Sequence, residues 1–294
     1  MPDDAPLAPA AFGGDESNSA AGAAPAAPRA VPAQWVLTLS CPDQPGIVHA
    51  VTGAIAERGG NILESQQFDD LDASRFFMRV QMEAPVQGAE LAAALQPVAA
   101  QYRMVWNLDA VGRPLRTVIM VSKASHCLHD LLYRRAQEAL PIDVVAVVSN
   151  HTDLEDVADF YGVPFRHIPV TKDTKAQAES QLEALVQDLG VELVVLARYM
   201  QVLSNDFCAR LPGRIINIHH SFLPSFKGAR PYAQAHQRGV KLIGATAHYV
   251  TADLDEGPII EQDVQRVTHA DSVSDLVRLG EDVERRTLAR AVRW

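Results

Sequence analysis

Short runs of Val, Ile and Leu alternate with longer helical segments in the second part of the chain, and this alternation constrains the fold more than any other feature. Segments at 126–139, 152–161 and 173–188 have helical length and composition. Between and after them lie the apolar runs, at 117–122, 143–149, 191–196 and 214–218. Continuous apolar runs are typical of strands buried on both faces of a parallel sheet. The sequence therefore predicts a doubly wound α/β domain over residues 115–294.

The preceding segment has a different order of elements. Strand-like and helical patterns follow one another as β-α-β-β-α-β, over residues 35–40, 47–55, 61–68, 75–82, 91–100 and 103–110. This order is typical of a split, ferredoxin-like unit in which helices cover one face of an antiparallel sheet. Gly112-Arg113-Pro114 breaks the pattern. We therefore expect a small separate domain over residues 34–111.

Composition excludes several classes of protein. Residues 1–33 contain twelve Ala and six Pro, which predicts a disordered tail without the basic start and apolar core of a signal peptide. The net charge of −10 leaves no overall basic footprint for nucleic acid or an anionic membrane. No apolar run approaches the roughly 18 residues of a membrane span. We expect a cytoplasmic protein with a small-molecule partner.

Polar residues gather where the run at 214–218 ends. Strand alternation predicts that Asn217 and His219 point to one side and His220 to the other. Adjacent histidines on opposite faces cannot easily bind one ion, and the three widely spaced cysteines offer no metal knuckle, so we expect no metal. A buried Asn beside a His at a strand end is costly unless its hydrogen bonds are satisfied, which favours a polar site over a core residue.

A second strand, predicted at 242–250, brings His248 close to an acidic loop. That loop contains Asp253, Asp255 and Glu256, and it can return a carboxylate towards the first strand. A carboxylate beside a histidine orients the ring and favours its protonated form, so acid–base chemistry at neutral pH becomes available. For Asp253 and Glu256 the alternative is a solvated turn.

Three spaced motifs carry a family resemblance. Asn-x-His with Ser-x-Leu-Pro is followed by Gly-x-Thr-x-His-x-Val and Leu-Asp-x-Gly-Pro-Ile-Ile. In this order, over residues 116–292, the sequence resembles the 10-formyltetrahydrofolate-dependent formyltransferase and hydrolase superfamily, which implies a Rossmann-like catalytic domain. The resemblance further implies that Asn217, His219 and Asp255 are catalytic. It implies a folate substrate and no separate cofactor.

Several features favour the hydrolytic branch, in which water accepts the formyl group and formate is released. His220 replaces the Pro found in glycinamide ribonucleotide transformylases, and Gly-Ala-Arg-Pro-Tyr at 228–232 also resembles the hydrolases. The turn at 121–127 lacks the glycine-rich loop that would cradle an acceptor's phosphate. One alternative is a formyltransferase with an amine acceptor. Another is an amino-acid-binding regulatory protein whose catalytic domain has decayed.

The segment at 196–204 resembles the part of the superfamily that surrounds the pterin. Its apolar residues would form the walls of a folate pocket, although Leu and Met are also ordinary core residues. The two arginines are candidates for anionic groups, with a solvated surface as the alternative. The substrate-binding candidates are Leu196, Arg198, Met200, Val202, Leu203, His220, Arg230 and His248.

The first domain, over about residues 35–110, resembles an ACT domain. The resemblance rests on Asp-Gln-Pro-Gly-Ile at 43–47 and Gly-Gly-Asn-Ile at 59–62. It implies an amino-acid effector bound near Asp43, Gly46, Ile47 and Asn61, at an edge shared with a second copy of the chain, and hence a homo-oligomer. The alternatives are a turn that merely caps the helix, or a module kept only for dimerisation.

The end of the chain predicts a helix over residues 272–294. Ser272 and Asp275 provide its cap, and Val273, Leu276, Val277, Val283 and Leu288 are expected on one apolar stripe. Members of the superfamily continue into a final short strand, so we expect a shortened chain.

Overall fold

The computed structural model describes residues 33–225 and 230–293. The chain divides into two compact units between Val111 and Gly112. Residues 1–32 of the predicted tail lie outside the described residues, as do Gly228 and Ala229 of the hydrolase-like motif.

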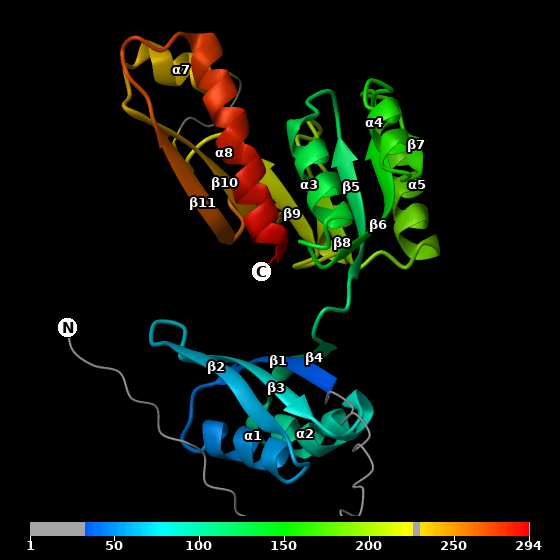
Figure 1. Cartoon of the computed structure of the whole chain (residues 1–294), viewed down its shortest axis with the longest axis vertical. Coiled ribbons are helices and arrows are strands. Elements are labelled where there is room, and N and C mark those ends of the chain that lie inside the picture. Colours follow the sequence, from blue (N-terminus) through cyan, green and yellow to red (C-terminus); the bar gives the residue numbers. More distant parts are fainter. Residues whose placement is uncertain (1–32, 226–229, 294) are drawn as a thin grey trace, which may run out of the picture. The chain divides into compact units, whose positions relative to one another are not determined.

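The first unit has the predicted β-α-β-β-α-β order. Its elements are β1 (Ala33–Pro42), α1 (Ile47–Ala56), β2 (Asn61–Asp70), β3 (Arg75–Ala84), α2 (Gly88–Tyr102) and β4 (Val105–Ala110). The strands form one antiparallel sheet in the order β2-β3-β1-β4. Both helices cover the same face of this sheet, as Figure 1 shows. The antiparallel sheet with two helices confirms the predicted architecture.

The second unit is built on a seven-stranded sheet in the order β11-β10-β9-β8-β5-β6-β7. Its strands are β5 (Leu115–Val121), β6 (Ile142–Ser149), β7 (Phe165–His167), β8 (Leu193–Leu196), β9 (Ile215–His219), β10 (Leu242–Tyr249) and β11 (Ile259–Arg266). Its helices are α3 (His126–Ala136), α4 (Glu155–Phe160), α5 (Lys175–Asp188), α6 (Asn205–Arg210), α7 (Pro231–Gln237) and α8 (Val273–Arg293). Strands β5 to β9 are parallel, whereas β10 runs antiparallel to both β9 and β11.

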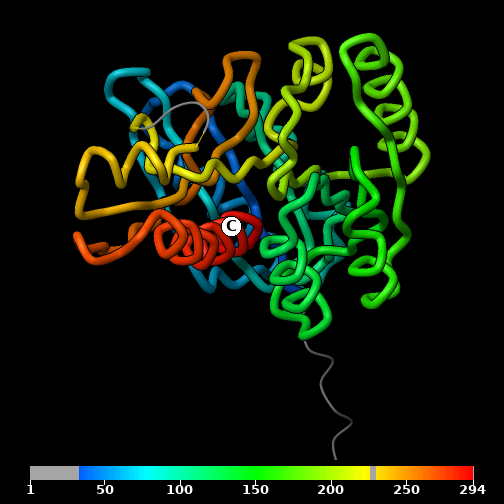
Figure 2. Tube along the Cα trace, turned by 90° about the horizontal axis from the view of Figure 1, so that it is seen from above, coloured from blue at the N-terminus to red at the C-terminus, as the bar shows by residue number. Residues whose placement is uncertain are grey.

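Helices cover both faces of this sheet. Figure 2 shows α3, α4 and α8 on one face and α5 and α6 on the other. Each side has its own cluster of buried apolar residues, so the strands between them are covered twice and need continuous apolar sequence. The predicted α/β architecture is confirmed, with a mixed sheet.

Four elements of the second unit were not predicted: β7, α6, α7 and β11. β7 has three residues, and α6 and α7 have six and seven, so their sequences are too short to show a periodicity. β11 lies at the edge of the sheet and is not fully buried, so its sequence IIEQDVQR is polar and lacks a continuous apolar run.

The strand order creates a topological switch point between β5 and β8. From β5 the chain proceeds outwards to β6 and β7, then returns to β8 on the other side of β5. In open α/β sheets, ligands bind in the crevice outside the carboxyl ends of the strands at such a point. The ends of β5, β8 and β9 are therefore where a site is expected.

Helix α8 begins with the predicted cap, in which Ser272 and Asp275 each bond the other's backbone N–H, at 3.0 and 3.2 Å. Leu276, Val283 and Leu288 of the predicted apolar stripe are buried, whereas Val273 and Val277 are 38% and 37% exposed. The buried face also includes Gly280, Glu284 and Thr287. Among the described helices, none is long and apolar enough to cross a membrane.

Candidate active site

Strand β9 and its neighbour β10 supply the first polar groups of the site. β9 lies between β8 and β10, and Asn217 on β9 is directly opposite His248 on β10. His219 ends the strand and is 7% exposed, while His248 is 2% exposed. The register therefore brings two histidines and an amide to the carboxyl end of β9.

Asp255 reaches this place from the loop between β10 and β11. Its backbone has a left-handed conformation, with φ of 57°. Gly257 allows the loop to close, because a Cβ there would lie only 1.8 Å from the carbonyl oxygen of Tyr249. The carboxylate then lies with Oδ2 3.2 Å from Nδ1 of His219 and Oδ1 3.6 Å from Nε2 of His248.

These contacts fix the charge of Asp255 and the orientation of His219. The hydrogen bond from His219, followed by that from His248, holds the pKa of the Asp255 carboxyl well below its ordinary value. The ionised carboxylate accepts a hydrogen bond from Nδ1–H of His219. Nε2 is therefore the ring nitrogen that remains available to a substrate. Nε2 is buried and has no hydrogen-bond partner among the described residues.

His248 lines the cavity, but its contacts are with the other polar residues of the site. Its Nδ1 lies 2.9 Å from the backbone oxygen of Tyr249, which can only accept, so Nδ1 carries a proton. Nε2 lies 3.2 Å from Nδ2 of Asn217 and 3.6 Å from Oδ1 of Asp255, so the ring contacts both side chains. His248 thereby orients Asn217 and faces Asp255.

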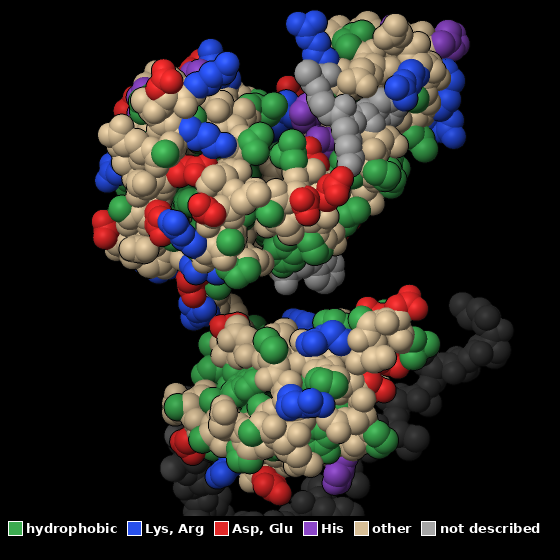
Figure 3. All heavy atoms as spheres, turned by 180° about the vertical axis from the view of Figure 1, so that it is seen from behind, with side chains coloured by type: hydrophobic (Ala, Val, Ile, Leu, Met, Phe, Trp, Pro, Cys, Tyr) green, Lys and Arg blue, Asp and Glu red, His purple; other side chains and the backbone are tan. Residues whose placement is uncertain are grey.

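A cavity of about 290 Å³ opens on these residues. This volume is close to the lower end of the roughly 300–1,000 Å³ found for small-molecule sites. Histidine side chains, drawn purple, lie in a hollow on the face of the second unit that Figure 3 shows. The cavity is lined by Leu196, Arg198–Leu203, Cys208, Asn217–His220, His248 and Val250–Asp255.

The structure brings most of the predicted substrate-binding residues to this cavity. Leu196 and Leu203 are buried in its wall, whereas Met200 and Val202 are 58% and 54% exposed. The segment is a loop and not the start of a helix, and the backbone N–H of Met200 donates to Oγ of Ser122 at 3.0 Å. Arg230 is exposed and is not among the residues that line the cavity.

The predicted orientation of His220 is wrong. Strand alternation placed it opposite His219, yet both line the same cavity and their ring centroids are 5.5 Å apart. The reason is that β9 ends at His219, so the alternation no longer applies to the next residue. Burial, together with the positive charge of Arg198, lowers the pKa of His220 to about 4. His220 is therefore neutral at physiological pH.

This low pKa predicts a pH-dependent stability. The native state keeps His220 neutral down to about pH 4, whereas the unfolded chain takes up a proton near its ordinary value of 6.5, so stability falls as the pH drops between these values. A His220→Asn variant is expected to lose less of its melting temperature than the wild type between pH 7 and pH 5. Thermal melts at both pH values measure this, and equal losses in the two proteins would contradict it.

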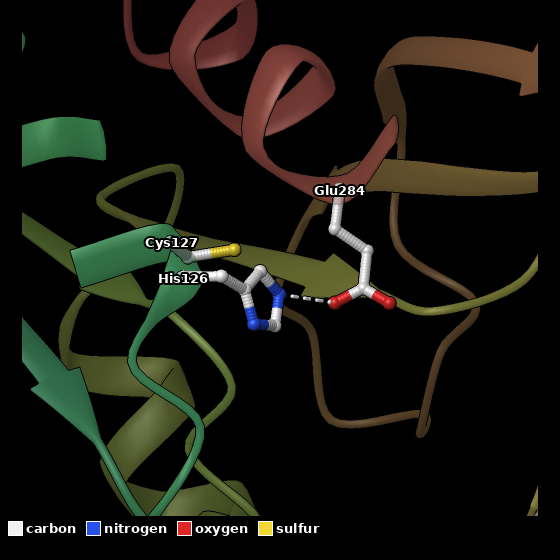
Figure 4. Close-up of side chains that lie close together, drawn as sticks. All are labelled: His126, Cys127 and Glu284. Carbon is white, nitrogen blue, oxygen red and sulfur yellow. Dashed lines mark hydrogen bonds and ion pairs between the residues drawn. The ribbon is translucent and has the colours of Figure 1, made fainter. Parts of the chain in front are cut away.

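A buried polar cluster beside the cavity was not predicted. His126, Cys127 and Glu284 have ligand-type atoms within 4.8 Å of one another, as in a metal site. Figure 4 shows that Nε2 of His126 instead bonds the Glu284 carboxylate, at 2.8 Å. Tyr232 and Arg198 also face this carboxylate, which is thus satisfied by protein groups. The signal in the sequence was an acidic residue four positions after Gly280 on the apolar face of α8.

The candidate effector residues lie at the turn between β1 and α1 and at the start of β2. Gly46 has φ of 94°, which favours glycine, and Asp43 is exposed. Asn61 donates from Nδ2 to Oε1 of Glu83 at 3.0 Å. Ile47 is 2% exposed and belongs to the core of the first unit, so only its backbone is available to an effector.

The class of protein follows from matches to two known families. Residues 115–292 match the formyl transferase family and residues 35–94 match the ACT domain. A formyltetrahydrofolate deformylase from Corynebacterium sp. (strain P-1) is 52% identical over 262 residues, which are 88% of this chain and 92% of the relative. The chain belongs to the formyltetrahydrofolate deformylase family.

Solved structures agree with this assignment. The crystal structure of a formyltetrahydrofolate deformylase from Burkholderia mallei matches with a TM-score of 0.86 and 52% identity, covering 89% of this chain and 94% of that one. A glycinamide ribonucleotide transformylase from Symbiobacterium toebii matches with a TM-score of 0.59 and 33% identity. That likeness covers 64% of this chain and 90% of the transformylase.

Proposed function

We propose that this protein hydrolyses 10-formyltetrahydrofolate to formate and tetrahydrofolate, and so supplies formate to purine and one-carbon metabolism. Membership of the deformylase family supports the reaction. The single observation that carries it in this chain is the meeting of Asn217, His219 and Asp255 at a cavity, although Asp255 comes from a distant loop.

The mechanism that we propose follows from where charge develops. Attack of water on the formyl carbon creates an oxyanion, and the Asn217 amide with the protonated His219 ring donates to it. Nε2 of His219 suits this role because it is buried and has no hydrogen-bond partner among the described residues. One such donor is typically worth roughly 3–4 kcal/mol of barrier.

Asp255 has two functions in this proposal. Its ionised carboxylate holds the His219 ring in place through Nδ1, and it helps to remove the proton of the attacking water, an effect of about 10²- to 10⁴-fold. The C–N10 bond then breaks, and N10 takes a proton from either His219 or Asp255. We propose that His248 holds Asn217 and Asp255 in place, since it contacts both.

The cavity would hold the pterin end of the substrate. Its loop from Arg198 to Leu203 offers backbone donors and acceptors beside exposed apolar side chains, which suits a flat, polar-edged ring. Arg198 and His220 line the same cavity as the catalytic residues. Arg230, exposed at the start of α7, remains a candidate for the anionic tail of a folate.

The test is incubation of the purified protein with 10-formyltetrahydrofolate, with and without amine acceptors. Formate and tetrahydrofolate are expected in equal amounts without any acceptor. Loss of the formyl group only when an amine is added would assign the chain to the alternative, a formyltransferase.

For the first unit we propose an amino-acid effector and a role in homo-oligomer formation, in a cytoplasmic enzyme. The ACT match and the exposed turn at Asp43 and Gly46 support this. Calorimetric titration with single amino acids, and the mass of the protein in solution, test the two parts separately.

A further inference from the structure

The switch-point crevice of the second unit is filled by the protein's own side chains. His126 begins α3, just after β5, and Arg198 follows β8, so both stand at the strand ends that border the crevice. Glu284 projects between them from α8, as Figure 4 shows for His126 and Glu284. A crevice in this position ordinarily admits a ligand.

Glu284 is the centre of this cluster. It is fully buried, and its Oε2 accepts from Nε2 of His126 at 2.8 Å and lies 3.5 Å from Nε of Arg198. Its Oε1 accepts from the hydroxyl of Tyr232 at 2.6 Å. Burial opposes ionisation, but the bond from His126 and the charge of Arg198 lower the pKa of Glu284, so it stays a carboxylate. Every oxygen of this buried anion is thus matched by a donor.

A glycine makes room for the fourth member. Gly280 lies one turn before Glu284, and a Cβ there would be 2.1 Å from the ring and hydroxyl of Tyr232. Glycine is unfavourable within a helix, so its presence in the middle of α8 indicates that the approach of Tyr232 is a built feature. The absence of a side chain at Gly280 therefore lets Tyr232 pack directly against α8.

The cluster adjoins the catalytic residues, and only its member Arg198 lines their cavity. The ring of His220 is 5.5 Å from that of His219 on one side and 6.2 Å from that of Tyr232 on the other. Arg198, His219 and His220 form the cavity wall, whereas Glu284, Tyr232 and His126 are not among its lining residues. Glu284, Tyr232 and His126 therefore lie behind this wall, on the side that faces away from the folate pocket.

We propose that the cluster of Arg198, Glu284, His126 and Tyr232 closes the switch-point crevice to amine acceptors and thereby reserves the formyl group for water. The inference rests on the proposed function and adds the residues that set its specificity. In both reactions the C–N10 bond breaks and N10 gains a proton. Attack on the formyl carbon by the oxygen of water yields formate, whereas attack by an amine nitrogen would yield a formamide.

The solved transformylase shows the acceptor that the same fold can be named for. It shares the fold at 33% identity and is named for glycinamide ribonucleotide, an amine that carries a phosphate. An acceptor of that kind needs an open approach to the formyl carbon and a place for its phosphate. In this chain His126, which follows β5, instead bonds Glu284. The buried carboxylate of Glu284 would repel a phosphate at this place.

The test opens the cluster and offers a small amine. The double variant His126→Ala/Glu284→Ala removes the buried carboxylate together with its hydrogen-bond partner at 2.8 Å, and it leaves every residue that lines the folate cavity in place. With 10-formyltetrahydrofolate and glycinamide, the wild type is expected to form formate only. The double variant is expected to divert formyl groups to N-formylglycinamide, at a product ratio at least about tenfold above the wild type. Asp282→Asn, which changes a half-exposed carboxylate on the same helix, should behave as the wild type.

The outcomes separate the two proposals. Wild-type protein that releases no formate without an amine contradicts the proposed function, whatever the variants do. A folded double variant with the wild-type product ratio, or one that cleaves no formyl group, overturns the specificity role of the cluster. Should the double variant fail to fold, Tyr232→Phe decides in its place, since it keeps the ring and removes only the donor to Glu284, and an unchanged ratio there is equally adverse.

Discussion

A His219→Ala variant is expected to release formate about 10²- to 10³-fold more slowly than the wild type, with its fold and substrate affinity retained. The variant loses Nε2, the donor to the oxyanion in the proposed mechanism, and Asp255 loses its closest partner, at 3.2 Å. Because this interaction is made with charge that exists only in the transition state, kcat should fall and KM should change little. Steady-state formate release measures both parameters.

The matched control is His269→Ala, which removes an exposed histidine from the same unit. This control should keep kcat within about twofold, since surface substitutions of this kind are usually almost neutral. A folded His219→Ala protein with near-normal turnover would remove His219 from the mechanism.

An Asp255→Asn variant is expected to show the largest loss, of about 10⁴-fold in kcat, by analogy with the replacement of a carboxylate that orients a catalytic histidine. The amide cannot stabilise the imidazolium or accept a proton from water. It can also present N–H to Nδ1 of His219 and so select the wrong tautomer. Asp282→Asn is again the control, and turnover by Asp255→Asn within tenfold of the wild type would argue against a base at this position.

Stability should respond to the same substitution in a pH-dependent manner. The pKa of Asp255 is lowered in the folded state from an ordinary value of 3.8, so its stabilising effect is present above pH 3.8 and is lost as the pH falls further. The melting temperatures of the wild type and Asp255→Asn should therefore differ most near neutral pH and converge below pH 3.8. A constant difference across this range would mean that the ion pair does not stabilise the fold.

The architecture was predictable because it depends on patterns that persist over many residues. Strands β5, β6, β8 and β9 are covered on both faces and therefore carry continuous apolar runs, which the sequence displays. Short elements such as β7 and α7 have no such pattern and depend on the packing of their neighbours. The orientation of His220 was missed for a similar reason, since strand alternation holds only as far as the strand extends.

The opposite case is Glu284. In the sequence it differs from Glu281 only by falling on the apolar face of the helix, and this difference does not identify its partners. Its importance comes from His126, Arg198 and Tyr232, which are 158, 86 and 52 positions away along the chain. Only the folded chain can assemble partners from such distances.

The sequence by itself determined the element order of the first domain, the longer elements of the second, and the identity of Asn217, His219 and Asp255 as candidates, because hydrophobic periodicity and spaced motifs are local properties. Tertiary structure decided how these groups meet: that Asp255 faces two histidines, that His220 shares their cavity, and that a buried carboxylate fills the neighbouring crevice. The charge and hydrogen bonding of a side chain depend on what surrounds it, and those surroundings arise only when distant segments pack together.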